Sequence, residues 1–127
     1  MASERCPCLS GLPYDECCGP LHRGEATAPT AERLMRSRFS AYARRLPAYL
    51  LATWHPNTRP KQLLLDADTR WYRLDILDRR AGGMLDSEGT VAFEAFYRTT
   101  RDSGSQRENS RFRREDSRWL YLDGDSY

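Results

Sequence analysis

The sequence of 127 residues contains no cysteine after residue 18, a single lysine, Lys61, and no long apolar run. A membrane-spanning helix needs about 18 consecutive apolar residues, and no segment comes near that length. Residues 1–5 lack the apolar stretch of a secretory signal peptide. The chain is also too short for a (β/α)8 barrel, which needs about 250 residues. We therefore expect a cytoplasmic protein without a membrane partner, built as one domain with a small appendage.

Neither sign of charge dominates, because 20 basic residues are balanced by 18 acidic ones, for a net charge of +2. The small basic excess lies in the N-terminal half, where a solvated helix face accounts for it. Binding of one divalent metal ion by four thiolates would bring the net charge of the chain from +2 to zero and halve the excess of the N-terminal half. Nucleic acid is therefore not the partner that we expect.

The first part of the chain has the pattern of a small irregular unit followed by helices. Residues 1–24 are rich in cysteine, glycine and proline and show no apolar period, and residues 25–29 form a short linker. Thr30 is a suitable N-cap for a helix whose first turn carries Glu32. Apolar residues at helical spacing then predict helices over 31–45 and 47–54, with a further turn or short helix over 63–65.

After about residue 70 the apolar period changes from helical to alternating, which is typical of strands. Four strands are predicted over 72–77, 91–98, 108–113 and 119–123, joined by a loop over 80–89 and turns over 102–105 and 115–117. Short connections between successive strands predict an antiparallel meander. Helices followed by strands indicate an α+β fold, in which helices pack on one face of a curved antiparallel sheet and enclose a cone-shaped core. We expect two units, residues 1–24 and residues 25–127.

All the cysteines lie in one short cluster, made of Cys6, Cys8, Cys17 and Cys18. Four thiolates at this spacing can converge on one tetrahedral Zn2+ if the residues between them loop back, and glycine and proline there supply the bends. Closed coordination by four sulfurs is structural and leaves no open position for catalysis. Disulfides, an iron–sulfur cluster and a redox switch are the alternatives, and His22 could replace Cys18 as a ligand. Zinc is the cofactor that we expect.

The same region carries a family resemblance. Residues 6–19, with the pattern Cys-Pro-Cys-x-Ser-Gly-x-x-Tyr-x-x-Cys-Cys-Gly, resemble the SEC-C motif, the zinc-binding element at the C-terminal end of the SecA translocation ATPase. Leu9 stands where that motif usually has glycine. Further blocks that resemble the bacterial YchJ family follow in that family's order at residues 20–22, 34–42, 53–56, 108–112 and 119–124. The resemblance implies a zinc knuckle followed by a domain similar to nuclear transport factor 2, a cone of helices around a curved sheet.

A cone fold has an open mouth, so a second candidate site is a pocket inside the cone. Its candidate residues are Arg38, His55, Trp71, Glu108, Ser110 and Asp123. Arg38 can form a structural ion pair with Glu108 or Asp123, or it can receive an anionic ligand. His55 fits a helix C-cap, with a general base as the alternative. Glu108 and Ser110 fit cross-strand packing as well as a pocket wall.

These observations favour a non-catalytic adaptor. In SecA the similar tail contacts a chaperone and the ribosome, so the resemblance implies a protein partner of that kind, bound through the knuckle and nearby arginines. The alternative is a small-molecule-binding protein, or an enzyme, that uses the cavity of the cone. In a third hypothesis the zinc is purely a staple of the fold. The sequence has no Ser/His/Asp arrangement, phosphate loop or convincing carboxylate pair, so it identifies no catalytic residue.

Overall fold

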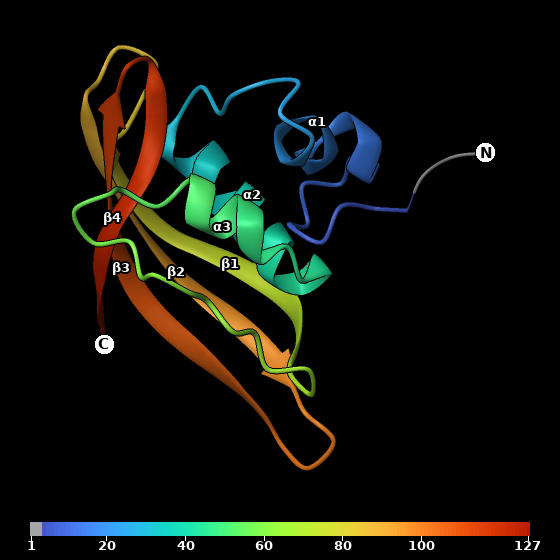
Figure 1. Ribbon diagram of the computed structural model, residues 1–127. Coiled ribbons are helices and arrows are strands. Elements are labelled where there is room, and N and C mark those ends of the chain that lie inside the picture. Colours follow the sequence, from blue (N-terminus) through green and yellow to red (C-terminus); the bar gives the residue numbers. More distant parts are fainter. Residues whose placement is uncertain (1–3) are drawn as a thin grey trace.

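The computed structural model describes residues 4–127 and shows a four-stranded sheet with helices on one side (Figure 1). The elements follow in the order η1 (Tyr14–Glu16), α1 (Cys18–His22), α2 (Ala31–Arg44), α3 (Pro47–Ala52), β1 (Arg70–Ala81), β2 (Glu88–Arg98), β3 (Ser103–Glu115) and β4 (Arg118–Ser126). Met1, Ala2 and Ser3, the start of the predicted N-terminal unit, lie outside the described residues. Within residues 4–127, no helix combines the length and the apolar character needed to cross a membrane.

The strands form an antiparallel meander in the order β1-β2-β3-β4, so the predicted α+β class and connectivity are confirmed. Register shifts leave Tyr72 and Leu77 of β1 and Leu122 of β4 without a paired residue, and such bulges bend a strand and increase its twist. The bent sheet curves around α2 and α3, and the N-terminal segment with α1 lies beyond these helices (Figure 1). The molecule therefore has three layers, with α2 in the middle.

The start of helix α2 is fixed by Thr30, which precedes it, and by Gly82, which follows β1. Thr30 caps it by accepting a hydrogen bond from the Arg33 amide, as predicted, and the Ala31 amide donates to the carbonyl of Gly82 after β1. The apolar face of α2 packs on strand residues whose side chains point toward the helix, and these alternate along each strand with residues that point away. The core between helix and sheet includes Leu34, Met35, Phe39, Leu74, Val91, Phe93, Phe112 and Trp119.

The predicted helix over 47–54 ends two residues early, because α3 stops at Ala52. The chain then pairs with β4. The Tyr121 amide donates to the carbonyl of Thr53, and the His55 amide donates to the carbonyl of Tyr121. Pairing with a strand requires an extended backbone, so the helix cannot continue through these residues.

The prediction of a turn or short helix over 63–65 is wrong, because this stretch has no regular secondary structure. Leu64 is 82% exposed, so the leucines here do not form the buried face that a helix would need. The guanidinium of Arg45 instead holds the following residues by donating to the carbonyls of Asp66, Ala67 and Thr69.

The strands are longer than predicted, so the loop predicted over 80–89 shortens to 82–87, and the turn predicted over 102–105 lies instead at 99–102. Alternating apolar residues mark only the part of each strand that covers the core. Beyond the core the strands continue as exposed, mainly polar segments, such as residues 78–81 of β1 and 105–107 of β3. Such polar extensions carry no apolar period to predict them from.

Candidate functional site

The first candidate site is the cysteine cluster of the knuckle, which the structure describes over residues 4–24. The sulfur atoms of Cys6, Cys8, Cys17 and Cys18 all lie within 4.8 Å of one another, and all four residues are buried. The Cys8 and Cys17 sulfurs are 3.6 Å apart, and those of Cys17 and Cys18 are 4.0 Å apart. A disulfide requires about 2.05 Å. Four sulfurs bonded to one tetrahedral ion at about 2.3 Å lie about 3.8 Å apart. The four free thiols therefore have the geometry to hold one metal ion.

A tight loop presents the first two cysteines. The Cys6 amide donates to the carbonyl of Leu12, and the Leu9 amide donates to the carbonyl of Cys6, which turns the chain at Cys8. Leu9 has a left-handed φ of 65°, a conformation that suits glycine and strains a residue with a side chain. This departure from the SEC-C pattern therefore costs backbone strain but removes no ligand. Cys17 and Cys18 come from the junction between η1 and α1.

His22 does not join the cluster. One of its ring nitrogens is hydrogen-bonded to the Tyr14 hydroxyl, and the other lies 2.8 Å from the carbonyl oxygen of Ser37 on α2. Burial lowers the pKa of His22. Both ring nitrogens are thus engaged, so His22 does not replace Cys18, and the imidazole instead ties α1 to α2.

The thiols are too close together to ionise independently. Hydrogen bonds with Cys6 and Cys8, together with burial, raise the pKa of Cys18, and the Arg33 guanidinium opposes this by donating to the Cys18 sulfur at 3.5 Å. The hydrogen bond from Cys18 lowers the pKa of Cys6. A cation at the centre of the cluster would take the place of the shared protons, because the thiolate is the form that binds metals.

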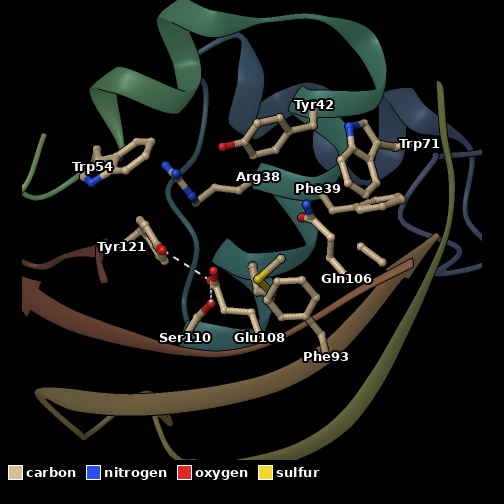
Figure 2. Close-up of a pocket in the computed structure, with 12 residues that line it drawn as sticks. Arg38, Phe39, Tyr42, Trp54, Trp71, Phe93, Gln106, Glu108, Ser110 and Tyr121 are labelled. Carbon is tan, nitrogen blue, oxygen red and sulfur yellow. Dashed lines mark hydrogen bonds between the residues drawn. The ribbon is translucent and has the colours of Figure 1, made fainter. Parts of the chain in front are cut away.

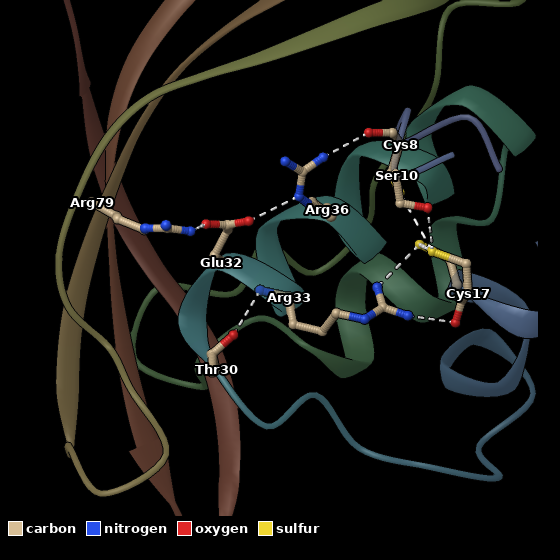
Figure 3. Close-up of polar contacts among 9 residues, drawn as sticks. Cys8, Ser10, Cys17, Thr30, Glu32, Arg33, Arg36 and Arg79 are labelled. Carbon is tan, nitrogen blue, oxygen red and sulfur yellow. Dashed lines mark hydrogen bonds and ion pairs between the residues drawn. The ribbon is translucent and has the colours of Figure 1, made fainter. Parts of the chain in front are cut away.

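Two arginines of α2 fix the cluster to the rest of the chain (Figure 3). Arg33 donates to the carbonyl of Cys17 as well as to the sulfur of Cys18. Arg36 donates to the carbonyl of Cys8 at 2.9 Å. These contacts place the positive charges of the two arginine side chains beside the thiols, where they lower the free energy needed to form thiolates.

The arginine-rich face of α2 is therefore already occupied. Glu32 accepts hydrogen bonds from Arg36 and from Arg79 of β1, so polar contacts continue from the knuckle to the sheet (Figure 3). The Arg44 guanidinium lies 3.9 Å from the ring centroid of Tyr14 in the knuckle. The arginines expected beside the knuckle thus have contacts within the chain, and Arg44 is also exposed.

The second candidate site is a cavity of about 170 Å³ between α2 and the sheet. In Figure 2 side chains from the helix and from the strands converge around this space. The lining residues are Met35, Arg38, Phe39, Tyr42, Trp54, Trp71, Phe93, Ala95, Gln106, Glu108, Ser110 and Tyr121. A mainly apolar and aromatic wall with a few polar groups is typical of small-molecule sites.

Among the described residues Arg38 is the only cation that lines this cavity, and it is 3% exposed. Its Nη1 donates to the Leu50 carbonyl and to the Thr53 hydroxyl, both at 2.7 Å. The guanidinium carbon lies 5.0 Å from the ring centroid of Trp54 and 4.6 Å from that of Tyr121. Burial lowers the pKa of Arg38, but an arginine remains charged in a protein. Within residues 4–127 it has no ion pair with a carboxylate, so the predicted structural pair with Glu108 or Asp123 is wrong.

Glu108 enters the cavity from β3. Its Oε2 accepts hydrogen bonds from the hydroxyls of Ser110 and Tyr121 (Figure 2). Burial, and next the neighbouring Glu108 carboxylate, raise the pKa of Tyr121. Tyr121 therefore stays a protonated donor, and Glu108 is held as an acceptor.

Comparison with known proteins finds matches for both parts of the chain. The family model for "YchJ, middle NTF2-like domain" matches residues 30–124, and the model for the SEC-C motif matches residues 3–20. The chain belongs to the YchJ family. The predicted resemblance to that family, to the SEC-C motif and to nuclear transport factor 2 is thereby confirmed.

Relatives of this YchJ-family chain match along its whole length. A UPF0225 protein of Corynebacterium glutamicum is 54% identical over 122 residues, which cover 96% of this chain and 97% of the relative. A UPF0225 protein of Streptomyces coelicolor is 49% identical over 125 residues, which cover 98% of each chain. The solution structure of a SEC-C motif containing protein from Rhodopseudomonas palustris is 34% identical, with a TM-score of 0.82, over 96% of this chain and 98% of that one. A crystal structure of another such protein, from Psychrobacter arcticus, is 27% identical, with a TM-score of 0.76, over 94% of this chain and 81% of that one.

In this YchJ-family structure, four of the six residues expected in the pocket line the cavity, namely Arg38, Trp71, Glu108 and Ser110. His55 and Asp123 do not. The His55 ring accepts a hydrogen bond from the Asn57 amide and contacts Glu115 with its other nitrogen, so it is neither a general base in the cavity nor the helix C-cap, a position taken by Thr53. Asp123 pairs with Arg111, because its β4 position lies opposite Arg111 in the β3–β4 pairing.

Three polar residues of the cavity were missed from the sequence: Tyr42, Gln106 and Tyr121. Tyr42 lies one helical turn after Arg38 and Gln106 lies two strand positions before Glu108, so each shares a face with a residue that was singled out. This spacing was a usable signal. Tyr121 instead reaches Glu108 across the β3–β4 pairing, whose register the sequence pattern did not define.

Proposed function

We propose that this YchJ-family protein is a zinc protein whose cone domain binds a small molecule in the cavity between α2 and the sheet. The buried charge of Arg38 carries the proposal, because a cation without a carboxylate partner at the wall of a mainly apolar cavity is suited to hold a ligand. The knuckle holds α2, the helix that carries Arg38. In this proposal the metal is a staple that supports the cavity wall.

Zinc is the metal that fits the knuckle best. Four thiolate sulfurs favour Zn2+ over Mg2+ or Ca2+, and a buried, closed set of four is typical of a structural site. Freshly purified, unchelated protein is expected to contain one equivalent of zinc by elemental analysis. A content below about half an equivalent, or stoichiometric iron in its place, would contradict the assignment.

The binding function is tested by NMR titration of the zinc-loaded chain with single-ring fragments, some charged and some neutral. Shifts are expected at the amides of cavity residues. Ala95 on β2 lines the cavity, whereas Ala92 on the same strand does not. Ala95→Leu should fill the space and abolish the shifts, while the matched control Ala92→Leu should preserve them. Shifts that survive Ala95→Leu would place the fragments elsewhere and contradict the proposal.

The surface of the knuckle supports a second function, the adaptor. Leu9 and Leu12 are 53% and 49% exposed on the loop between the cysteine pairs. Exposed apolar side chains on a rigid loop suit contact with a protein, and the similarity to the SecA tail implies a ribosome or a chaperone. Leu9→Ser combined with Leu12→Ser leaves all four cysteines in place and should abolish co-sedimentation with ribosomes. Leu64→Ser, at another exposed leucine, is the control; equal sedimentation of all three proteins would reject the adaptor.

A further inference from the structure

The size of the cavity limits the ligand to one ring. An apolar cavity of about 150 Å³ is enough to hold benzene, and this one measures about 170 Å³. Aromatic side chains, including Phe39, Phe93 and Trp71, contribute to its wall. A flat ring can pack against such side chains in offset or edge-on contact. A fused polycyclic ligand would exceed the space.

At the helix side, Arg38 has donors to spare. Its Nη1 is used twice, by the Leu50 carbonyl and the Thr53 hydroxyl, but Nε and Nη2 have no hydrogen-bond acceptor among residues 4–127. Trp54 and Tyr121 contact the guanidinium through their rings, which fixes its position without neutralising its charge (Figure 2). A preorganised guanidinium with free N–H groups matches a planar carboxylate.

At the sheet side, Glu108 has an acceptor to spare. Ser110 and Tyr121 both donate to Oε2, and Oε1 has no partner in the described part of the chain. A ligand that carries only negative charge would meet this carboxylate with repulsion. A ligand with an O–H or N–H group at the end opposite its acid would instead donate to Glu108.

We infer that the cavity selects a single-ring aromatic acid that also bears a hydroxyl or amino hydrogen, with its carboxylate on Arg38 and its donor on Glu108. This inference rests on the proposed binding function and specifies the ligand class. Both recognition groups belong to this chain and come from different elements of the cavity wall, α2 and β3.

Three probes separate the two ends of the ligand: 4-hydroxybenzoate carries both groups, benzoate only the acid, and phenol only the donor. Calorimetry on the zinc-loaded full chain should give 4-hydroxybenzoate the highest affinity. Benzoate and phenol should each bind about tenfold or more weakly, because each lacks one hydrogen-bonded interaction with a charged group. NMR titration should place all the shifts at the cavity.

Variants of the two recognition residues test which of them binds each end of the ligand. Glu108→Gln should remove the preference for 4-hydroxybenzoate over benzoate, because one amide oxygen can still accept from Ser110 and Tyr121 but leaves an amide donor toward the ligand. Arg38→Gln should weaken both acids by about tenfold or more and leave phenol unchanged. Arg80→Gln changes an exposed arginine outside the cavity and is the control. If Arg38→Gln does not fold, the isosteric Glu108→Gln still decides the result.

The outcomes separate this inference from the proposed function. A preference for 4-hydroxybenzoate over benzoate that disappears in Glu108→Gln supports both the binding function and the ligand class. Phenol binding in the cavity as tightly as 4-hydroxybenzoate keeps the binding function but overturns the ligand class. If none of the three probes shifts the NMR signals of the cavity residues, both the binding function and the ligand class are overturned.

Discussion

Gly124 shows how one absent side chain positions a functional group. It lies opposite Ser110 in the β3–β4 pairing, and a Cβ placed on it would lie 2.6 Å from both Cδ and Oε2 of Glu108. A glycine inside a strand often marks such a close approach. Only glycine at this position leaves room for the carboxylate where Ser110 and Tyr121 hold it.

Gly124→Ala should therefore displace Glu108 and break its hydrogen bonds with the two hydroxyls. We expect the free energy of unfolding to fall by about 1–2 kcal/mol, measured by urea denaturation. Gly83→Ala is the control, since a Cβ there meets only the Asp86 carboxylate, at 3.4 Å. Equal effects of the two substitutions would show that Gly124 does not hold space open for Glu108.

The buried ring of His22 gives the chain a pH dependence of known sign. Because burial lowers its pKa from 6.5, the unfolded chain takes up a proton at a higher pH than the folded chain does. Stability is then lost as pH falls below the unfolded value, with a slope of at most about 1.4 kcal/mol per pH unit. His22→Gln keeps a polar side chain that does not titrate, so its free energy of unfolding should fall less between about pH 7.5 and 5.5. Metal loss at low pH affects wild type and His22→Gln alike, so the difference between their free energies of unfolding reports on His22. Parallel curves of this free energy against pH would refute the role of His22.

At the scale of elements, α2 connects the two candidate sites, the cysteine cluster and the cavity, which the sequence presents as separate. The apolar period predicted the helix and its core face, and Thr30 predicted its start. The role of Arg33 and Arg36 was not predictable, because their partners are backbone carbonyls and a sulfur of a segment distant in sequence. Period and capping are local signals, whereas docking of the knuckle depends on tertiary geometry. His55 was misassigned for the same reason, since Glu115 is sixty residues away.

Arg33→Gln should loosen the knuckle without touching a cysteine. It removes donors to the Cys17 carbonyl and the Cys18 sulfur, and loss of such outer contacts typically weakens a metal site about 10- to 100-fold. Transfer of zinc to a chromogenic chelator should accelerate by about that factor. Arg80→Gln provides the charge-matched reference, because Arg80 pairs only with Asp78 at the surface. Equal transfer rates in the two variants would rule out a supporting role for Arg33.

At the scale of the whole molecule, the chain has two separate cores. The four cysteines pack with Tyr14 in one buried cluster, and α2 packs with the sheet in another that contains no cysteine. The sequence predicts two units, residues 1–24 and 25–127, whereas Leu21 of the first unit packs in the second core. The sequence did not predict which residues close the cavity, because that depends on strand register and on the bulges in β1 and β4.

Separate cores predict that metal removal unfolds the molecule in part. A chelator at neutral pH should melt the knuckle, whose fold depends on the cysteine cluster, and leave the cone domain folded. Amides hydrogen-bonded within the knuckle, such as those of Cys6, Leu9 and Cys17, should lose protection from hydrogen exchange. Those of Val91 and Phe112 in the central strands should keep it, because their core holds no metal ligand.

The same removal should weaken but not abolish the cavity, since the contacts of Arg33 and Arg36 with the knuckle are lost from the helix that carries Arg38. We expect the melting temperature to fall by about 10 °C, which corresponds to about 3 kcal/mol for a chain of this size. Readdition of zinc should restore both the protection pattern and the melting temperature. Loss of protection in the central strands together with the knuckle would mean that the two cores form one cooperative unit, and the metal would then hold up the whole fold.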